Sequence, residues 1–537
     1  MRLYKNICLS ALAVMAFTFA SAQKKVAIDL NKIPAKVSPI KESDLKRWSH
    51  LDLSRDTIPG MSVDRAYNEL LKNRKGKKVI VGVIDSGVDI EHEDLKTVIW
   101  TNPKEIAGNN IDDDKNGYID DVHGWNFLGD ATNENLEMTR ILKKGDDGSP
   151  EYKRAQTAFD AQYSEVMMGK QQVDFIFGAK KLVADYLKKD NFTIEEVKAI
   201  DTKDPQLGKA KQIITNILAQ TGANFNSELN GFKDQIYDMT DYNLNKDFDG
   251  RKVVGDNPND LNDRVYGNNN VMGLDKEDAL HGTHVAGIIA AVRNNGIGSD
   301  GVATNVEILP VRAVPNGDEY DKDIALGIRY AVDNGAKVIN GSFGKAFSPQ
   351  KQWVWDAIKY AESKDVLIVF AAGNEGQDVD LEQNRSYPTD VGDDKNEIAS
   401  NVLTVGALNT TFDSALVAGF SNYGSTNVDV FAPGMKIYAS VPNNKYLYEQ
   451  GTSMASPNAA GVAALIRSYY PKLSAKQVKQ IMMDSGTQIT NEVVLGGSEE
   501  KRPFNKASRS GKMVNAFNAL MMAEKMSKGK RPNQLKG

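Results

Sequence analysis

Short apolar runs alternate with helix-like segments from residue 78 onwards, and this alternation limits the possible fold more than any other feature of the chain. Continuous apolar runs of this kind are typical of strands that are buried on both faces of a parallel sheet. The sequence therefore predicts a doubly wound, mostly parallel α/β sheet. The runs cover residues 79–84, 306–314, 337–343, 366–374, 402–408 and 428–434, with helical segments such as 323–336 and 349–365 between them.

Two regions interrupt this alternation. Residues 23–60 are polar and lack strong periodicity, which indicates an amino-terminal arm or a short pro-segment. Residues 131–265 are rich in Lys, Glu, Gln and Ala at helical spacing, and they predict a helical insertion in a domain that covers residues 61–525. We expect the Met and Phe positions of this insertion to form its own packing stripe. Residues 526–537 form a basic polar tail.

The amino terminus predicts export. Residues 1–22 combine a basic start, an apolar run and an Ala-Ser-Ala cleavage site, as a signal peptide does. The apolar run is shorter than the roughly 18 residues of a spanning helix, so no membrane span is predicted. Cys8 is the single cysteine and would leave with the signal, which excludes disulfides from the mature chain. A formal net charge of -5 provides no basic field, so nucleic acid is not expected as a partner.

Three chemically reactive side chains stand at the ends of predicted elements. Asp85 follows the first apolar run, His281 opens the segment HGTHVAGIIAA, and Ser453 in GTSMASP opens an apolar helix. Each has an ordinary structural alternative, such as an acidic turn cap or a serine N-cap. The pair His281 and His284 also suggests zinc, but a zinc site needs a third and usually a fourth ligand. The remaining histidines have no paired spacing, so zinc binding is disfavoured, and we interpret His284 as structural.

The combination of these segments resembles a known family. DSGVD, HGTHVAG and GTSMASP, together with AAGNEG at 371–376, are similar to the four signature segments of the subtilisin-like serine proteases, the subtilases. The resemblance runs from about Pro59 to about Leu520 and is interrupted by the insertion. It implies that Ser453 is the nucleophile, His281 the general base and then acid, and Asp85 the group that orients the imidazole. It further implies that Asn374 donates to the oxyanion and that the chemistry needs no cofactor.

The same resemblance implies a binding cleft for polypeptide substrates. Ser342, Phe343 and Gly344 fall where family members present an edge strand that pairs with the substrate backbone. Ala371, Ala372 and Gly373 match the segment that lines the pocket for the residue before the scissile bond. Because these side chains are small, we expect room for a bulky or apolar substrate side chain.

Other functions on the same residues stay open at this point. An inactive relative that serves as a binding module is disfavoured, because all four catalytic positions carry suitable residue types. A serine esterase or peptide ligase shares the acyl chemistry and is not excluded. The separation of Asp85 from His281 is several times that of compact family members, and it contains the insertion. We hypothesise that the insertion forms a lid or side domain near the active site.

An acidic segment predicts a structural cation site. The stretch NNIDDDKNGYIDD at 109–121 resembles the first half of a calcium loop, although the bidentate Glu expected at the twelfth position is absent. A solvated acidic turn is the alternative. A second, weaker candidate lies in 245–260, through Asp247 and Asp249. Calcium would stabilise the fold and take no part in the chemistry. The candidate ligands are Asp112, Asp114, Asn116, Asp120 and Asp121.

Overall fold

The computed structural model describes residues 40–529. The predicted signal peptide, Cys8 and the first part of the predicted arm lie outside the described residues, as do residues 530–537 of the predicted tail.

A nine-stranded sheet forms the centre of the molecule. The six apolar runs of the sequence form six adjacent strands of this sheet. All of the pairs that involve these six strands are parallel, and only the terminal pair β10–β13 is antiparallel. The predicted fold class is confirmed. In sheet order the strands are β10 (Thr487–Gln488), β13 (Lys512–Met513), β7 (Val430–Pro433), β6 (Val402–Leu408), β5 (Leu367–Ala371), β4 (Val338–Gly341), β1 (Val79–Asp85), β3 (Val306–Arg312) and β2 (Trp125–Asn126).

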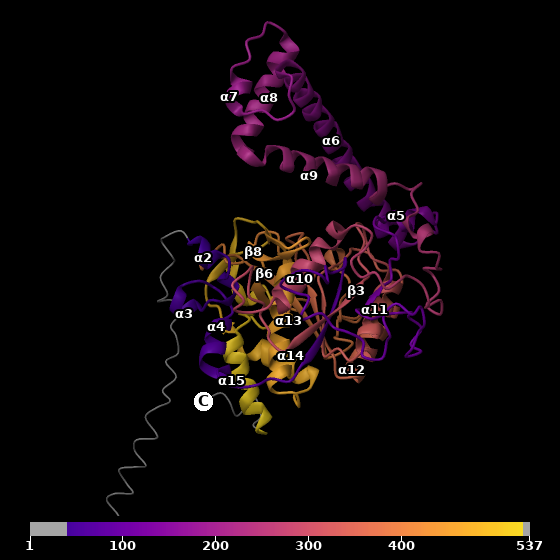
Figure 1. The fold of residues 1–537 in the computed structure, drawn as a ribbon, viewed down its shortest axis with the longest axis vertical. Helices are drawn as coiled ribbons and strands as arrows, with labels where there is room; N and C mark the ends of the chain where they lie inside the picture. Colours follow the sequence, from indigo (N-terminus) through magenta and orange to yellow (C-terminus); the bar gives the residue numbers. More distant parts are fainter. Residues whose placement is uncertain (1–39, 530–537) are drawn as a thin grey trace, which may run out of the picture.

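Helices cover both faces of this sheet (Figure 1). In β1, Val81 and Val83 belong to the core on one face, whereas Ile84 belongs to the core on the other. Burial on both sides explains why the strands read as continuous apolar runs and not as alternating ones. One face carries α10 (Leu280–Ala290), α13 (Thr452–Tyr469), α14 (Ala475–Ser485) and α15 (Ala516–Ser527), and the other carries α11 (Asp321–Asp333) and α12 (Lys351–Ser363).

The described part of the predicted arm packs into the main core. Trp48 is fully buried, and its indole donates a hydrogen bond to the Met435 carbonyl at 3.0 Å. Ile58 joins the same core. Residues 40–60 therefore help to build the folded body. The short helices here are α2 (Glu42–Leu45), α3 (Leu53–Asp56) and α4 (Val63–Ala66), and two hairpins complete the fold, β8–β9 (Ile437–Val441 and Lys445–Glu449) and β11–β12 (Glu492–Val494 and Lys501–Pro503).

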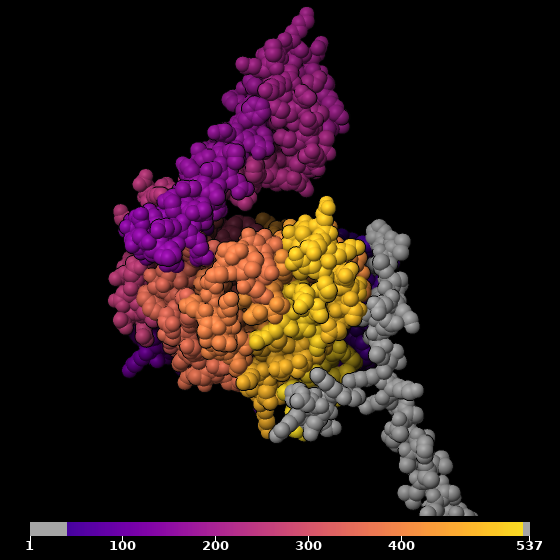
Figure 2. Space-filling view, turned by 180° about the vertical axis from the view of Figure 1, so that it is seen from behind, coloured from indigo at the N-terminus to yellow at the C-terminus, as the bar shows by residue number. Residues whose placement is uncertain are grey.

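The predicted insertion is helical and projects from the body as an arm (Figures 1 and 2). The longest helix, α6, begins where the Ser149 hydroxyl accepts a hydrogen bond from the Tyr152 amide and Pro150 occupies the first turn. The far part of the arm has an apolar core of its own, which includes Val183 and Ile214. The helices are α5 (Glu137–Lys143), α6 (Pro150–Leu187), α7 (Ile194–Lys198), α8 (Pro205–Thr221) and α9 (Phe225–Asp238).

The expected packing stripe of the insertion is wrong at two positions of α6. Phe159 is buried as expected, but Met168 and Phe175 are 65% and 52% exposed. The reason is that neighbouring helices cover only part of the circumference of α6 in this thin arm. Within residues 40–529, no helix has both the length and the apolar character that crossing a bilayer requires.

Candidate active site

The carboxyl end of β1 and the start of α10 bring Asp85 and His281 together. Asp85 is the last residue of β1, and its Oδ1 lies 2.7 Å from Nδ1 of His281. The same oxygen accepts a hydrogen bond from the Ser86 amide at 2.8 Å. Gly282 permits this approach, because a Cβ there would lie 2.1 Å from the Gly87 carbonyl oxygen. The glycine of the HGTH motif is thus required by the closeness of α10 to the Asp85 turn.

The environment of His281 raises the pKa of its imidazole above the ordinary value of 6.5. Burial acts to lower this pKa, but the Asp85 carboxylate more than offsets burial, and Glu449 adds a smaller upward effect. The imidazole keeps 39% of its side-chain surface exposed, so its desolvation is incomplete. The pair is therefore arranged to stabilise an imidazolium, which is the form that a general base adopts after it takes a proton.

Ser453 lies in the first turn of α13, a helix whose side chains are nearly all buried. The preceding Gly451 has a φ of 151°, in the region that favours glycine. The Ser453 hydroxyl donates to the Ser342 carbonyl at 3.1 Å and makes no hydrogen bond to His281 in the described structure. The helices α10 and α13 pack against each other, which places both residues at one edge of the sheet.

Asn374 is held in an orientation that frees its amide nitrogen. Its Oδ1 accepts hydrogen bonds from the Thr452 amide at 2.8 Å and from the Thr452 hydroxyl at 3.0 Å, which fixes Nδ2 as the outward-facing donor. A Cβ on Gly451 would lie 3.5 Å from both Asn374 Nδ2 and the Ser453 amide nitrogen. Two nitrogen donors therefore border one common space that glycine leaves open, which is where an oxyanion hole needs them.

A cavity of about 410 Å³ lies beside Ser453. Its lining includes Asn374 and most of the predicted substrate-binding residues, namely Phe343, Gly344, Ala371 and Gly373. Two predicted residues lie elsewhere. Ala372 is 3% exposed and packs in the main core. The Ser342 hydroxyl faces α13, where it donates to the Ser453 carbonyl at 2.8 Å. The Ser342 side chain thus connects the end of β4 to α13.

The acidic loop at 109–121 brings some of its predicted ligands together and not others. Asp114 and Asp121 meet Glu105, with one oxygen atom of each within 4.8 Å of the others. The Asp112 and Asp120 carboxylates instead accept hydrogen bonds from backbone amides. Asp120 accepts from the Gly108 amide at 2.9 Å and from the Asn110 amide at 2.8 Å. The Asn116 side chain donates to Asp121 at 3.0 Å. The loop therefore forms a three-carboxylate group that includes one residue from outside the predicted motif.

Comparisons with known proteins identify the family of this chain. The family model described as "Subtilase family" matches residues 76–507. This chain belongs to the subtilase family. It is 41% identical to a cell wall-associated protease of Bacillus subtilis (strain 168) over 234 residues. These residues are 43% of this chain and 24% of that protein. It is 46% identical over 189 residues to a thermophilic serine proteinase of Bacillus sp. (strain AK1), covering 35% of this chain and 42% of the relative.

A shorter relative is matched over more of its length. Subtilisin DY of Bacillus licheniformis is 36% identical over 219 residues, which cover 40% of this chain and 73% of that subtilase. The chain spans less than half the length of the first two relatives. The family that the signature segments predicted is confirmed.

The zinc interpretation of the histidine pair does not fit this subtilase. His284 is fully buried, and its Nε2 lies 3.1 Å from the Ile437 carbonyl and 3.3 Å from the Leu447 carbonyl. Burial lowers the pKa of His284 to about 4, so the ring is neutral near pH 7. The two imidazoles are thus committed to different partners, and His284 is structural.

Sequence reasoning missed two groups of residues at this site. Glu105 joins the acidic group, but it stands four residues before the quoted segment and outside its alternating spacing. Leu136 and Met138 line the cavity beside Ser453, although they belong to the insertion. The only signal for their position was the placement of the insertion between Asp85 and His281, which suggested proximity without naming residues.

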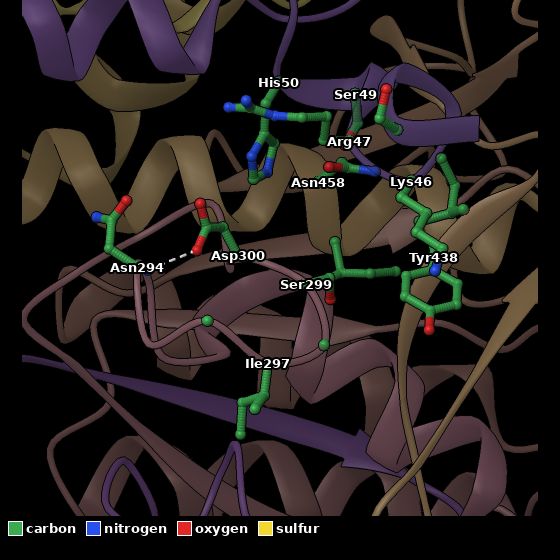
Figure 3. Close-up of a pocket in the computed structure, with 15 residues that line it drawn as sticks. Lys46, Arg47, Ser49, His50, Asn294, Ile297, Ser299, Asp300, Tyr438 and Asn458 are labelled. Atoms are coloured by element: carbon green, nitrogen blue, oxygen red, sulfur yellow. Dashed lines mark hydrogen bonds between the residues drawn. The ribbon is translucent and has the colours of Figure 1, made fainter. Parts of the chain in front are cut away.

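A second cavity, of about 540 Å³, lies between residues 43–50 and the loop at 294–300 (Figure 3). Lys46, Arg47 and His50 line one side, and the Asn294 amide donates to Asp300 Oδ1 at 2.7 Å on the other. Burial, followed by the charge of Arg293, lowers the pKa of His50 well below its ordinary value. The lining contains none of the predicted catalytic or substrate-binding residues.

Proposed function

We propose that this subtilase is an exported serine endopeptidase that hydrolyses peptide bonds through an acyl-enzyme. The observation that carries the proposal is the convergence of the Asn374 Nδ2 and Ser453 amide donors on one space, beside a cavity that Ser453 lines. The hydrogen-bonded pair of Asp85 and His281 supplies the base. Export rests on the predicted signal peptide, which lies outside the described residues.

Acylation follows from the roles of these side chains. The Ser453 hydroxyl leaves the Ser342 carbonyl and transfers its proton to Nε2 of His281 while Oγ bonds to the scissile carbonyl carbon. Asp85 holds Nδ1 and stabilises the imidazolium that results. When the tetrahedral intermediate collapses, the C–N bond breaks and His281 gives its proton to the leaving amine. Water then repeats the sequence on the ester and releases the acid.

The negative charge that develops on the carbonyl oxygen is stabilised by fixed donors. Asn374 is oriented by Thr452 before substrate arrives, so little reorganisation is needed during the reaction. Loss of one such donor in a serine protease costs roughly a hundredfold to a thousandfold in kcat.

The test of the proposal is covalent labelling of the purified protein with a fluorophosphonate, with the modified residue located by mass spectrometry. We expect modification of Ser453, because the reagent requires a serine activated by a base. The His281→Ala variant, with its helix content unchanged, should not be labelled. Labelling at another serine, or labelling that does not depend on His281, would contradict the proposed triad. Turnover of ester but not amide substrates would favour the esterase alternative.

We further propose that Glu105, Asp114 and Asp121 hold a structural calcium ion. The donor set suits a hard cation, since all three groups offer carboxylate oxygens. Glu105 Oε2 is buried and has no hydrogen-bond partner. Burial raises the pKa of the Asp121 carboxyl to about 6. Bound calcium would stabilise the loop and act at no step of the chemistry.

Removal of calcium is expected to lower the melting temperature. At a calcium concentration a hundredfold above Kd, binding adds about 2.7 kcal/mol to the free energy of unfolding. Differential scanning calorimetry with a chelator, and again after calcium is restored, measures this difference. Glu105→Gln removes one ligand charge and should reduce the calcium-dependent shift, whereas the exposed control Glu499→Gln should not. A melting temperature that changes neither with chelator nor with added calcium would refute the site.

A further inference from the structure

The root of the insertion, defined here as residues 134–143, is built into the substrate side of the body. The α5 helix lies against two loops, one at 318–321 and one at 343–348. The second loop continues directly from the predicted substrate-pairing segment that ends at Gly344. The root is therefore in direct contact with the part of the body that the proposed function assigns to substrate binding.

Buried charges join the root to both loops. Lys345 donates to Glu137 Oε2 at 2.8 Å and to the Glu319 carbonyl at 2.7 Å. Arg140 donates to the carbonyls of Asp318 at 2.8 Å and Glu319 at 3.1 Å. The Lys345, Glu137 and Arg140 side chains are only 2%, 4% and 7% exposed. Breaking a buried pair of this kind leaves an uncompensated buried charge, so the root holds a fixed position.

Apolar contacts complete the same junction. Phe347 of the body packs with Met138, Leu142 and Phe159 of the insertion. The Arg154 guanidinium lies over the Phe347 ring at 4.1 Å and donates to the Ala346 carbonyl at 3.1 Å. Both the ionic and the apolar contacts fix the first turns of α5 and α6 beside the cleft.

The cavity beside Ser453 shows what this position does. Four insertion residues line it, Leu136, Met138, Ala158 and Gln162, together with Phe343, Phe347 and Ser453 of the body. The charged residues of the lining all have partners. Asp318 accepts from the Glu137 amide at 2.7 Å, and Lys345 is held by Glu137. Glu375 accepts from Asn422 at 2.6 Å, and Arg385 pairs with Asp393 at 3.0 Å. The wall that the insertion offers to the cavity is therefore mainly apolar, with a flexible methionine that can adjust to different side-chain shapes.

We propose that Leu136 and Met138 are specificity-determining residues, which select a bulky apolar side chain on the acyl side of the scissile bond. The proposal rests on the proposed function, since it takes a substrate backbone along Ser342–Gly344 with its carbonyl at Ser453. Such a substrate places an acyl-side residue in the cavity, where burial against Leu136, Met138 and Phe343 stabilises the complex. The insertion thus forms one wall of the substrate cleft in addition to carrying the projecting arm.

The experiment measures peptide binding and does not require turnover. In a full-length Ser453→Ala background, Kd is determined for peptides that carry Leu or Ala at one of the four acyl-side positions in turn. We expect one position to favour Leu, and we expect Leu136→Ala and Met138→Ala each to reduce that preference about tenfold. Leu142→Ala is the matched control, because Leu142 packs in the same cluster but does not line the cavity. Its preference should equal that of the background.

A second variant distinguishes a changed cavity wall from a misfolded root. Leu136 is only partly buried, and Leu136→Glu should shift the preference at the same position from Leu towards Lys, a gain that a disordered root would not give. Unchanged preferences in both alanine variants, or an equal loss in Leu142→Ala, would overturn the assignment. If the peptides are selected in this way but the unmodified chain hydrolyses none of them, the proposed endopeptidase activity is contradicted. The assignment of the cavity wall would then still stand.

Discussion

Replacement of Ser453 by alanine is expected to lower kcat on a peptide substrate by about a millionfold. The magnitude is that known for the corresponding change in subtilisin, a member of the same family, and it is carried over by similarity. The physical reason is that the hydroxyl, the base and the orienting carboxylate act as one unit, so removal of the nucleophile abolishes the acyl-enzyme route. Time courses with a fluorogenic peptide, extended to long times for the slow variant, measure the loss in kcat.

The residual activity of this variant is also informative. The Ser453 amide and Asn374 Nδ2 still face their common space in the alanine variant, so a rate above that of the uncatalysed reaction should persist. Addition of His281→Ala to Ser453→Ala should cost little more, because the base no longer has a proton to take. A Ser453→Ala protein that keeps more than about one hundredth of the activity would show that another residue is the nucleophile.

Replacement of Asp85 by asparagine is expected to lower kcat by about ten-thousandfold, by analogy with the triad of other serine proteases. Asparagine fills the same volume at this buried position, but its amide favours the wrong tautomer of His281 and provides no charge for the imidazolium. Steady-state kinetics at saturating peptide measure the effect, with the melting temperature as the check on folding.

The same variant changes the pH profile in a defined direction. Activity needs neutral His281, so kcat/KM rises as pH increases through the pKa of the imidazole. Burial lowers this pKa, and the Asp85 carboxylate raises it above 6.5 in the unmodified chain. Without the carboxylate, burial dominates, and the midpoint of the residual activity should move to lower pH. A midpoint that stays in place in Asp85→Asn would mean that His281 is not the titrating base.

Much of the body could be predicted because its signals are local. The six adjacent strands are continuous apolar runs, since each is buried on both faces, and each run is visible without knowledge of its neighbours. Asp85, His281 and Ser453 stand at element ends with small residues around them. Those small residues leave room for close approach, as the contact of Gly282 with the Asp85 turn shows.

Other features depend on contacts between distant segments and left little trace in the sequence. Glu105 joins Asp121 only after the loop folds back, so the alternating acidic motif did not include it. Met138 was attributed to internal packing of the insertion, which is half correct, because it packs with Leu142 and also faces the cavity. The exposure of Phe175 could not be foreseen, because the number of neighbours around α6 is a property of the whole arm.

The buried charges at the root give the two halves of the insertion different freedom to diverge. Substitution, shortening or extension of the far part of the arm, around α7 and α8, leaves Glu137, Arg140 and Lys345 paired. Excision of the whole insertion leaves Lys345 without Glu137 and exposes the loop at 318–321. The far part of the arm can therefore differ between relatives without disturbing these pairs. The root, in contrast, can be retained or lost only together with the loop that carries Lys345.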